Sequence, residues 1–133
     1  MQQIEHIGIA VKDLEVSNAI FAAILGTASY KTEIVATENV ATSFFAVGNQ
    51  KIELLQATAP NTTIDKFIEK KGEGIHHIAF LVADIRAEMQ RLASEGFTLL
   101  SAEPKPGADN KLVCFLHPKT TNGVLIELCQ NID

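Results

Sequence analysis

The chain repeats one pattern of residues in its two halves, and this repeat limits its possible folds more than any other feature. Near the N-terminus "IEHIGIAVKDL" aligns with "IHHIAFLVADI" in the middle of the chain, and His6 corresponds to His77. Farther along, "KIELLQ" aligns with "LIELCQ", which pairs Glu53 with Glu127. Because two motifs recur in the same order, the sequence predicts a duplicated module.

The segments between the motifs predict the same order of elements, βαβββ, in each half. After each histidine strand an aspartate, Asp13 or Asp84, stands at an N-cap position, and a helix-compatible run follows and ends at a glycine. The β-rich runs are "SYKTEIV", "VATSFFAV" and "KIELLQ" in the first half and "FTLLS", "KLVCFL" and "GVLIELC" in the second. Between the halves, "NTTIDKFIEKKGEG" predicts a linking helix.

The expected fold class is therefore α+β, with two tandem βαβββ modules that form a half-open barrel around a metal cavity. A single domain is expected over residues 1–133. We expect the first module at about 1–60, the linking helix at about 61–73 and the second module at about 74–133. With 47% apolar and 20% charged residues, the composition is that of a globular protein with a real core.

Charge and cysteine usage argue against several classes of protein. The net charge of -5, without a cluster of lysines and arginines, disfavours nucleic acid as a partner. No basic leader or long apolar run is visible, so no membrane partner is expected and a cytoplasmic location is the default. Cys114 and Cys129 lie in strand-like runs without a close-spaced metal pattern, and we expect them to be buried thiols.

The four repeated polar residues predict a shared metal site. Because side chains alternate along a strand, each histidine faces away from its apolar neighbours, and each glutamate does the same. A carboxylate buried within such a strand needs a charged partner or a metal. If the modules pack with their sheets continuous, two imidazoles and two carboxylates surround one cavity and suit a divalent metal with open positions. The competing interpretation, satisfied strand histidines and solvated glutamates, does not explain the symmetry.

At these residues the sequence resembles the vicinal oxygen chelate (glyoxalase/dioxygenase-like) superfamily, and more narrowly the methylmalonyl-CoA epimerase family. The similarity covers nearly the whole chain and is most specific in "FIEKKGEGIHHIAFLVADI" and "FLHPKTTNGVLIELCQ". The resemblance implies that His6, Glu53, His77 and Glu127 are the metal ligands. In the family the second ligand is Gln or Glu. Some epimerases carry a further carboxylate on the preceding strand, where Thr42 stands at roughly the equivalent place.

The implied activity is epimerisation of methylmalonyl-CoA by proton transfer at the carbon alpha to the thioester, with a metal-stabilised enolate. The metal expected by resemblance is Co or Mn, with Ni, Zn and Mg also open. Glu127 is the first candidate for the general base and Glu53 the second. Lys111, His117 and Lys119 are candidate contacts of the CoA moiety, and His76 is expected to be structural. The expected assembly is a homodimer.

Three other functions remain open at this level. A glyoxalase I-type lactoylglutathione lyase, or another thiol-adduct isomerase, uses similar ligands and also moves a proton beside a carbonyl. A ring-cleaving dioxygenase commonly has two histidines and one carboxylate, so the fourth ligand disfavours it. A non-catalytic small-molecule binding protein has little need of all four ligands.

Overall fold

The computed structural model describes residues 1–133, which fold into two compact units. Residues 6–76 form one unit, which we call the N-terminal unit. Residues 77–133 form the other together with residues 1–5, and we call it the C-terminal unit. The predicted order βαβββ is confirmed in both halves of the chain.

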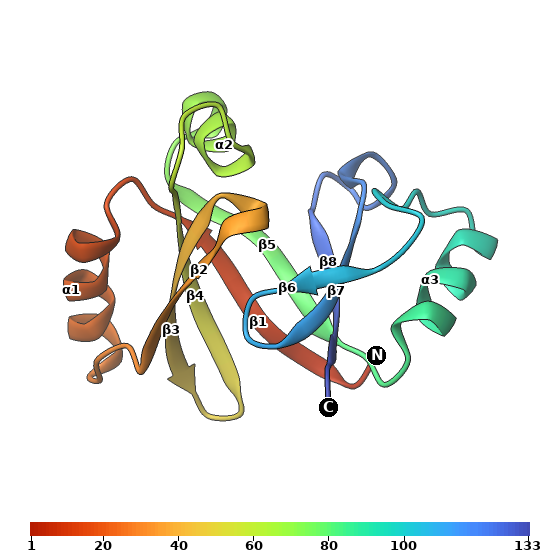
Figure 1. Ribbon diagram of the computed structural model, residues 1–133, viewed down its shortest axis with the longest axis horizontal. Coiled ribbons are helices and arrows are strands. Elements are labelled where there is room, and N and C mark those ends of the chain that lie inside the picture. Colours follow the sequence, from red (N-terminus) through yellow and green to blue (C-terminus); the bar gives the residue numbers. More distant parts are fainter. The chain divides into compact units, whose positions relative to one another are not determined.

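The N-terminal unit holds a four-stranded sheet in the order β2-β3-β4-β1 (Figure 1). The strand β1 runs parallel to β4, and the other neighbours are antiparallel. The elements are β1 (Gln3–Ala10), α1 (Leu14–Leu25), β2 (Lys31–Val35), the 3-10 turn η1 (Ala36–Glu38), β3 (Val40–Val47), β4 (Gln50–Ala57) and α2 (Thr63–Lys71). Residues 3–5 of β1 belong to the C-terminal unit.

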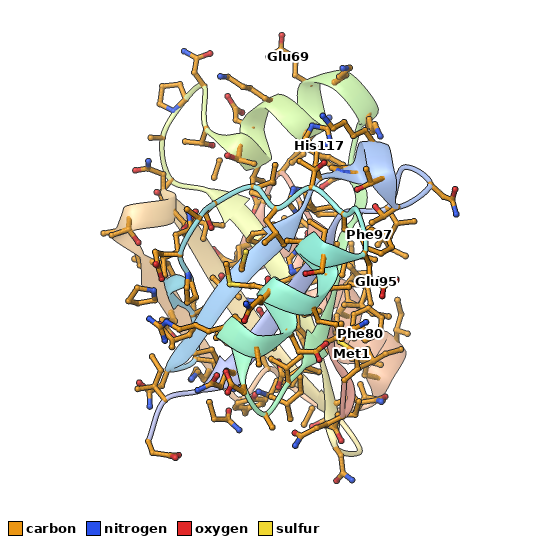
Figure 2. The ribbon with its side chains drawn as sticks, turned by 90° about the vertical axis from the view of Figure 1, so that its right-hand side faces the viewer. Met1, Glu69, Phe80, Glu95, Phe97 and His117 are labelled. Atoms are coloured by element: carbon orange, nitrogen blue, oxygen red, sulfur yellow. The ribbon has the colours of Figure 1, made fainter.

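The two faces of this sheet are covered by different helices. Phe21 of α1 packs on Phe45 and Leu54 on one face. On the other face, Leu55 lies in an apolar cluster with Ile64 of α2. The exposed residues of α2 include Lys66, Glu69 and Lys70, and Glu69 points away from the helix (Figure 2). The alternation of side chains thus separates the α1 face from the face that carries His6.

The C-terminal unit repeats this construction with the strand order β5-β8-β7-β6. Ile85 and Met89 of α3 pack on Cys114 and Leu128 on one face of the sheet. Both cysteines are buried and free, as predicted. The elements are β5 (Gly74–Leu81), α3 (Ile85–Ser94), β6 (Lys105–Gly107), β7 (Lys111–Leu116), the 3-10 turn η2 (Pro118–Thr120) and β8 (Ile126–Asn131). Residues 74–76 of β5 belong to the N-terminal unit.

The helices α1 and α3 begin in the same way. Asp13 and Asp84 cap them as predicted, each accepting a hydrogen bond of 3.1 Å from a backbone N–H in the first turn. Gln56 accepts a 2.6 Å bond from the first helical N–H of α1, and Gln130 accepts a 2.7 Å bond from that of α3. The glutamine that ends each repeated glutamate motif therefore fastens a glutamate strand to the start of a helix.

One predicted strand is wrong. The run "FTLLS", residues 97–101, forms only an isolated bridge between Leu99 and Leu116. The free edge of β7 is six residues long, and β6 already occupies three of them. Too little edge remains for a second strand, and Pro104 and Pro106 add no N–H donors to extend the pairing.

No helix in the structure is long and apolar enough to cross a membrane.

Candidate functional site

In the N-terminal unit, the structure brings His6 and Glu53 together. The Nδ1 atom of His6 lies 3.0 Å from Oε2 of Glu53, and both side chains are only 6% exposed. Glu53 stands opposite Gly8 on β1 and opposite Phe44 on β3. Since His6 is two residues from Gly8, the histidine and the glutamate share one face of the sheet. The glutamate is therefore buried beside an imidazole and is not solvated.

In the C-terminal unit, His77 and Glu127 form the second pair. The Nε2 atom of His77 lies 3.2 Å from Oε1 of Glu127, and the side chains are 5% and 8% exposed. Glu127 stands opposite Ala79 on β5 and opposite Phe115 on β7. The rings of His77 and Phe115 meet edge to face, with centroids 5.7 Å apart and an interplanar angle of 86°. This contact fixes the orientation of the imidazole.

The two pairs have the same surroundings, so the repeat includes more residues than the two aligned motifs. Each glutamate lies between a phenylalanine on the antiparallel neighbour and a small residue on the parallel neighbour. Sequence reasoning missed Phe44 and Phe115. The offset of 71 residues that relates His6 to His77 also relates these two phenylalanines, so the signal was present in the sequence.

The geometry of each pair suits metal coordination. At metal–ligand distances of about 2.0–2.2 Å, two ligands at a right angle lie about 3.0 Å apart. The nitrogen-to-oxygen separations within the pairs are 3.0 and 3.2 Å. An imidazole nitrogen and a carboxylate oxygen at this spacing match one edge of an octahedron. Each pair can therefore supply two ligands with little rearrangement.

Comparison with known proteins identifies the family. Residues 5–115 match the model of the glyoxalase/bleomycin resistance protein/dioxygenase superfamily. The chain is 42% identical over 130 residues to an ethylmalonyl-CoA/methylmalonyl-CoA epimerase of Cereibacter sphaeroides, covering 96% of this chain and 97% of the relative. It is 39% identical to the mitochondrial methylmalonyl-CoA epimerase of Homo sapiens, covering 96% and 73%. The chain belongs to the methylmalonyl-CoA epimerase family.

Solved structures agree with this assignment. A methylmalonyl-CoA epimerase in complex with methylmalonyl-CoA and NH4+ superimposes with a TM-score of 0.94 at 33% identity, covering 98% of this chain and 95% of that one. The glyoxalase-like fold expected from the sequence is thus confirmed. Since the match spans nearly the whole chain, it includes the strands that carry both His–Glu pairs.

A buried ionic cluster in the C-terminal unit involves one predicted CoA contact. The Nζ atom of Lys111 lies 2.9 Å from Oδ1 of Asn131, 3.4 Å from Oδ2 of Asp109 and 4.0 Å from Oε2 of Glu5. Lys111 and Glu5 are both buried. Glu5 was not among the residues that the sequence singled out, because it lies outside the repeated pattern of histidines and glutamates. The cluster neutralises the ammonium within the protein.

The other two predicted CoA contacts lie at η2, just after β7. His117 is half-buried at the start of η2 (Figure 2), and its Nδ1 accepts a 3.0 Å hydrogen bond from the backbone N–H of Lys119. The Lys119 side chain is exposed. In the N-terminal unit, His76 contacts Phe67 edge to face at 4.9 Å, which is a packing contact of α2.

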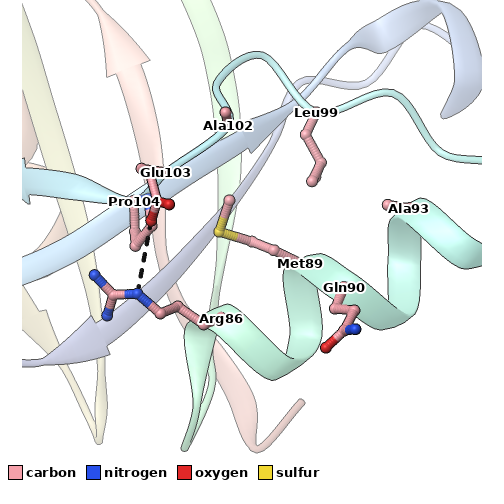
Figure 3. Close-up of a pocket in the computed structure, with 8 residues that line it drawn as sticks. All are labelled: Arg86, Met89, Gln90, Ala93, Leu99, Ala102, Glu103 and Pro104. Carbon is pink, nitrogen blue, oxygen red and sulfur yellow. Dashed lines mark ion pairs between the residues drawn. The ribbon is translucent and has the colours of Figure 1, made fainter.

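A separate pocket of about 350 Å³ lies between α3 and residues 99–104 of the C-terminal unit (Figure 3). Met89 and Leu99 line it, and Arg86 and Glu103 form a 3.7 Å ion pair at its rim. That pair is highly exposed, so solvent screens it. None of the predicted metal ligands lines this pocket, and its two charged residues, Arg86 and Glu103, pair with each other.

Proposed function

We propose that this protein is a metal-dependent epimerase that interconverts the two epimers of methylmalonyl-CoA. The observation that carries the proposal is the pair of matched, buried His–Glu contacts in a chain of the methylmalonyl-CoA epimerase family. One relative with this fold has been solved in complex with methylmalonyl-CoA. The proposed substrate is accordingly an acyl-CoA with an acidified C–H between a thioester and a carboxylate.

We assign His6, Glu53, His77 and Glu127 as the ligands of one divalent metal. The donor set supports this assignment, because two imidazoles and two carboxylates, found as two buried pairs, suit a divalent transition metal and leave octahedral positions open. We expect Co or Mn, with Ni, Zn and Mg as the alternatives. When bound, the metal supplies Lewis acidity that stabilises the negative charge developing on the thioester oxygen.

The proton at the alpha carbon needs a base on one face and a donor on the other. As the C–H bond breaks, its electron pair moves into the thioester carbonyl and its proton passes to a carboxylate. We assign this role first to Glu127 and second to Glu53. Glu127 contacts His77, and the His77 ring is in turn oriented by Phe115. Return of a proton to the opposite face gives the other epimer.

The remaining assignments concern the CoA moiety and the assembly. Phosphate groups require accessible cations, and among the three candidate contacts the exposed side chain of Lys119 is the most accessible. His117 and Lys111 are the other two candidate contacts of the CoA moiety, and both are less exposed than Lys119. We also propose a homodimer and a cytoplasmic location, both expected from the family resemblance and the sequence.

The test is loss of an α-deuterium label from methylmalonyl-CoA to solvent, with and without added Co or Mn. The expected result is exchange that requires the metal and stops on chelation. Parallel reactions use the hemithioacetal of glutathione and methylglyoxal. Turnover of the hemithioacetal without exchange of methylmalonyl-CoA would replace the epimerase with a glyoxalase-type isomerase. Binding of acyl-CoA without either reaction would indicate a binding protein.

A further inference from the structure

The hydroxyl of Thr42 is buried and has no hydrogen-bond partner within the protein. The residue is 1% exposed, and its Oγ1 is among three buried side-chain atoms that lack a partner. Most buried side-chain polar atoms do have a partner, because losing water without gaining a hydrogen bond is unfavourable. The hydroxyl therefore requires an explanation that protein contacts do not give.

Strand register places this hydroxyl on the face that carries Glu53. Thr42 lies opposite Leu55, and Phe44 lies opposite Glu53 on the same pair of strands. Residues two apart share a face, so Thr42 is the diagonal neighbour of Glu53. Diagonal neighbours have Cα atoms about 7–8 Å apart and side chains that are somewhat closer. A ligand bound on this face beside Glu53 is therefore within reach of the Thr42 hydroxyl.

The duplicated module shows that folding does not require this hydroxyl. The offset of 71 residues that relates His6 to His77 relates Thr42 to Val113. Val113 is buried in the matching position of β7, within an apolar cluster that includes Ala79 and Cys129. Valine has the shape of threonine without the hydroxyl, so the module packs well with an apolar residue there. The hydroxyl is an addition found in one half only.

We propose that Thr42 is a substrate-binding residue whose hydroxyl donates a hydrogen bond to the free carboxylate of the acyl group. This inference rests on the proposed epimerase function. A carboxylate accepts several hydrogen bonds at once, and it accepts them more strongly than a neutral carbonyl oxygen does. The bond forms with bound substrate before the proton moves, so it contributes mainly to substrate affinity.

The experiment compares Thr42→Val and Thr42→Ser with Ser43→Ala as the matched control. Ser43 also has a buried hydroxyl without a partner, and it is the next residue on β3. It lies opposite Leu54 and therefore on the α1 face. Substitution at either position removes one buried unpaired hydroxyl, but only Thr42 shares a face with Glu53. Thr42→Ala also removes the hydroxyl if the valine variant folds poorly.

We expect Thr42→Val to raise the KM for methylmalonyl-CoA about 10- to 100-fold, the loss typical of a hydrogen bond to a charged group, with a smaller change in kcat. Thr42→Ser should retain most of the affinity, and Ser43→Ala should resemble the wild type. Binding of propionyl-CoA, which lacks the carboxylate, should not change in Thr42→Val. Thermal unfolding should show equal or higher stability in both hydroxyl-deleted variants.

Unchanged kinetic constants in Thr42→Val and Thr42→Ala would overturn the inference. The hydroxyl would then bind only an ordered water or have no hydrogen-bond partner at all. Equal loss of affinity for propionyl-CoA would also overturn it, because the contact would then not involve the carboxylate. Absence of exchange in the wild-type protein is a different outcome, since it would refute the epimerase function itself.

Discussion

The replacement Glu127→Gln separates the proposed chemistry of Glu127 from its structural role. Gln has nearly the same shape, so the change removes a charge and leaves a side chain that still bonds to His77. A hydrogen bond to a charged group contributes about 1.5–3 kcal/mol and a neutral one about 0.5–1.5. The difference, about 1 kcal/mol, applies with little solvent screening because the pair is 5% and 8% exposed.

That loss is small beside the stability of the whole chain. A protein of 133 residues is typically stable by roughly 7–20 kcal/mol. At this size 1 kcal/mol lowers Tm by about 4 °C. The variant should therefore remain folded at 25 °C. If Glu127 is the base, kcat should nevertheless fall about 10²- to 10⁴-fold, which corresponds to roughly 3–5.5 kcal/mol in the barrier.

The matched control is Glu53→Gln, at an equally buried carboxylate in the other half. Its expected stability loss is the same. The family resemblance implies that either Gln or Glu serves at this position, so kcat should fall less than 10-fold. The assay is exchange of the α-deuterium label together with metal content and Tm for each variant. Full turnover by metal-loaded Glu127→Gln would refute the assignment of Glu127. A large loss in Glu53→Gln alone would transfer the role of base to Glu53.

Three further predictions concern other parts of the molecule. Asp84→Ala removes the N-cap of α3 and should lower stability by about 1 kcal/mol, measured by urea unfolding; no change would show that Gln130 alone suffices. Lys119→Ala should raise the KM for methylmalonyl-CoA without affecting a truncated pantetheine thioester, and equal effects on both would exclude contact with the CoA nucleotide. Ile85→Ala, at a fully buried position of α3, should cost about 2–5 kcal/mol in thermal unfolding, and a cost below 1 kcal/mol would contradict the packing described.

Local patterns were sufficient to predict most of the fold. The N-caps at Asp13 and Asp84 depend on residues within one turn of the helix, and the structure confirms them. The histidine and glutamate strands also follow from alternation, which is local. The strand predicted at residues 97–101 was wrong because β-propensity does not show whether a neighbouring strand has a free edge for pairing.

Contacts between residues far apart in the sequence could not be predicted from local patterns. Gln56 was visible in the repeat, but its bond to the start of α1 spans 42 residues and depends on how β4 lies beside the helix. The position of Phe44 opposite Glu53 depends on cross-strand register. Likewise, the burial of Glu5 with Lys111 joins the two ends of the sequence. The repeated residue types thus indicated which histidine and glutamate belong together, while the groups packed around each pair required the tertiary structure.

The central claim is that two duplicated His–Glu pairs bind one metal ion together. The most direct measurement is the number of Co ions bound per chain, by metal analysis and visible absorption, for the wild type, His6→Ala and His77→Ala. We expect one ion per chain in the wild type and loss of tight binding in both variants. Two ions per wild-type chain, each removed by only one substitution, would contradict it.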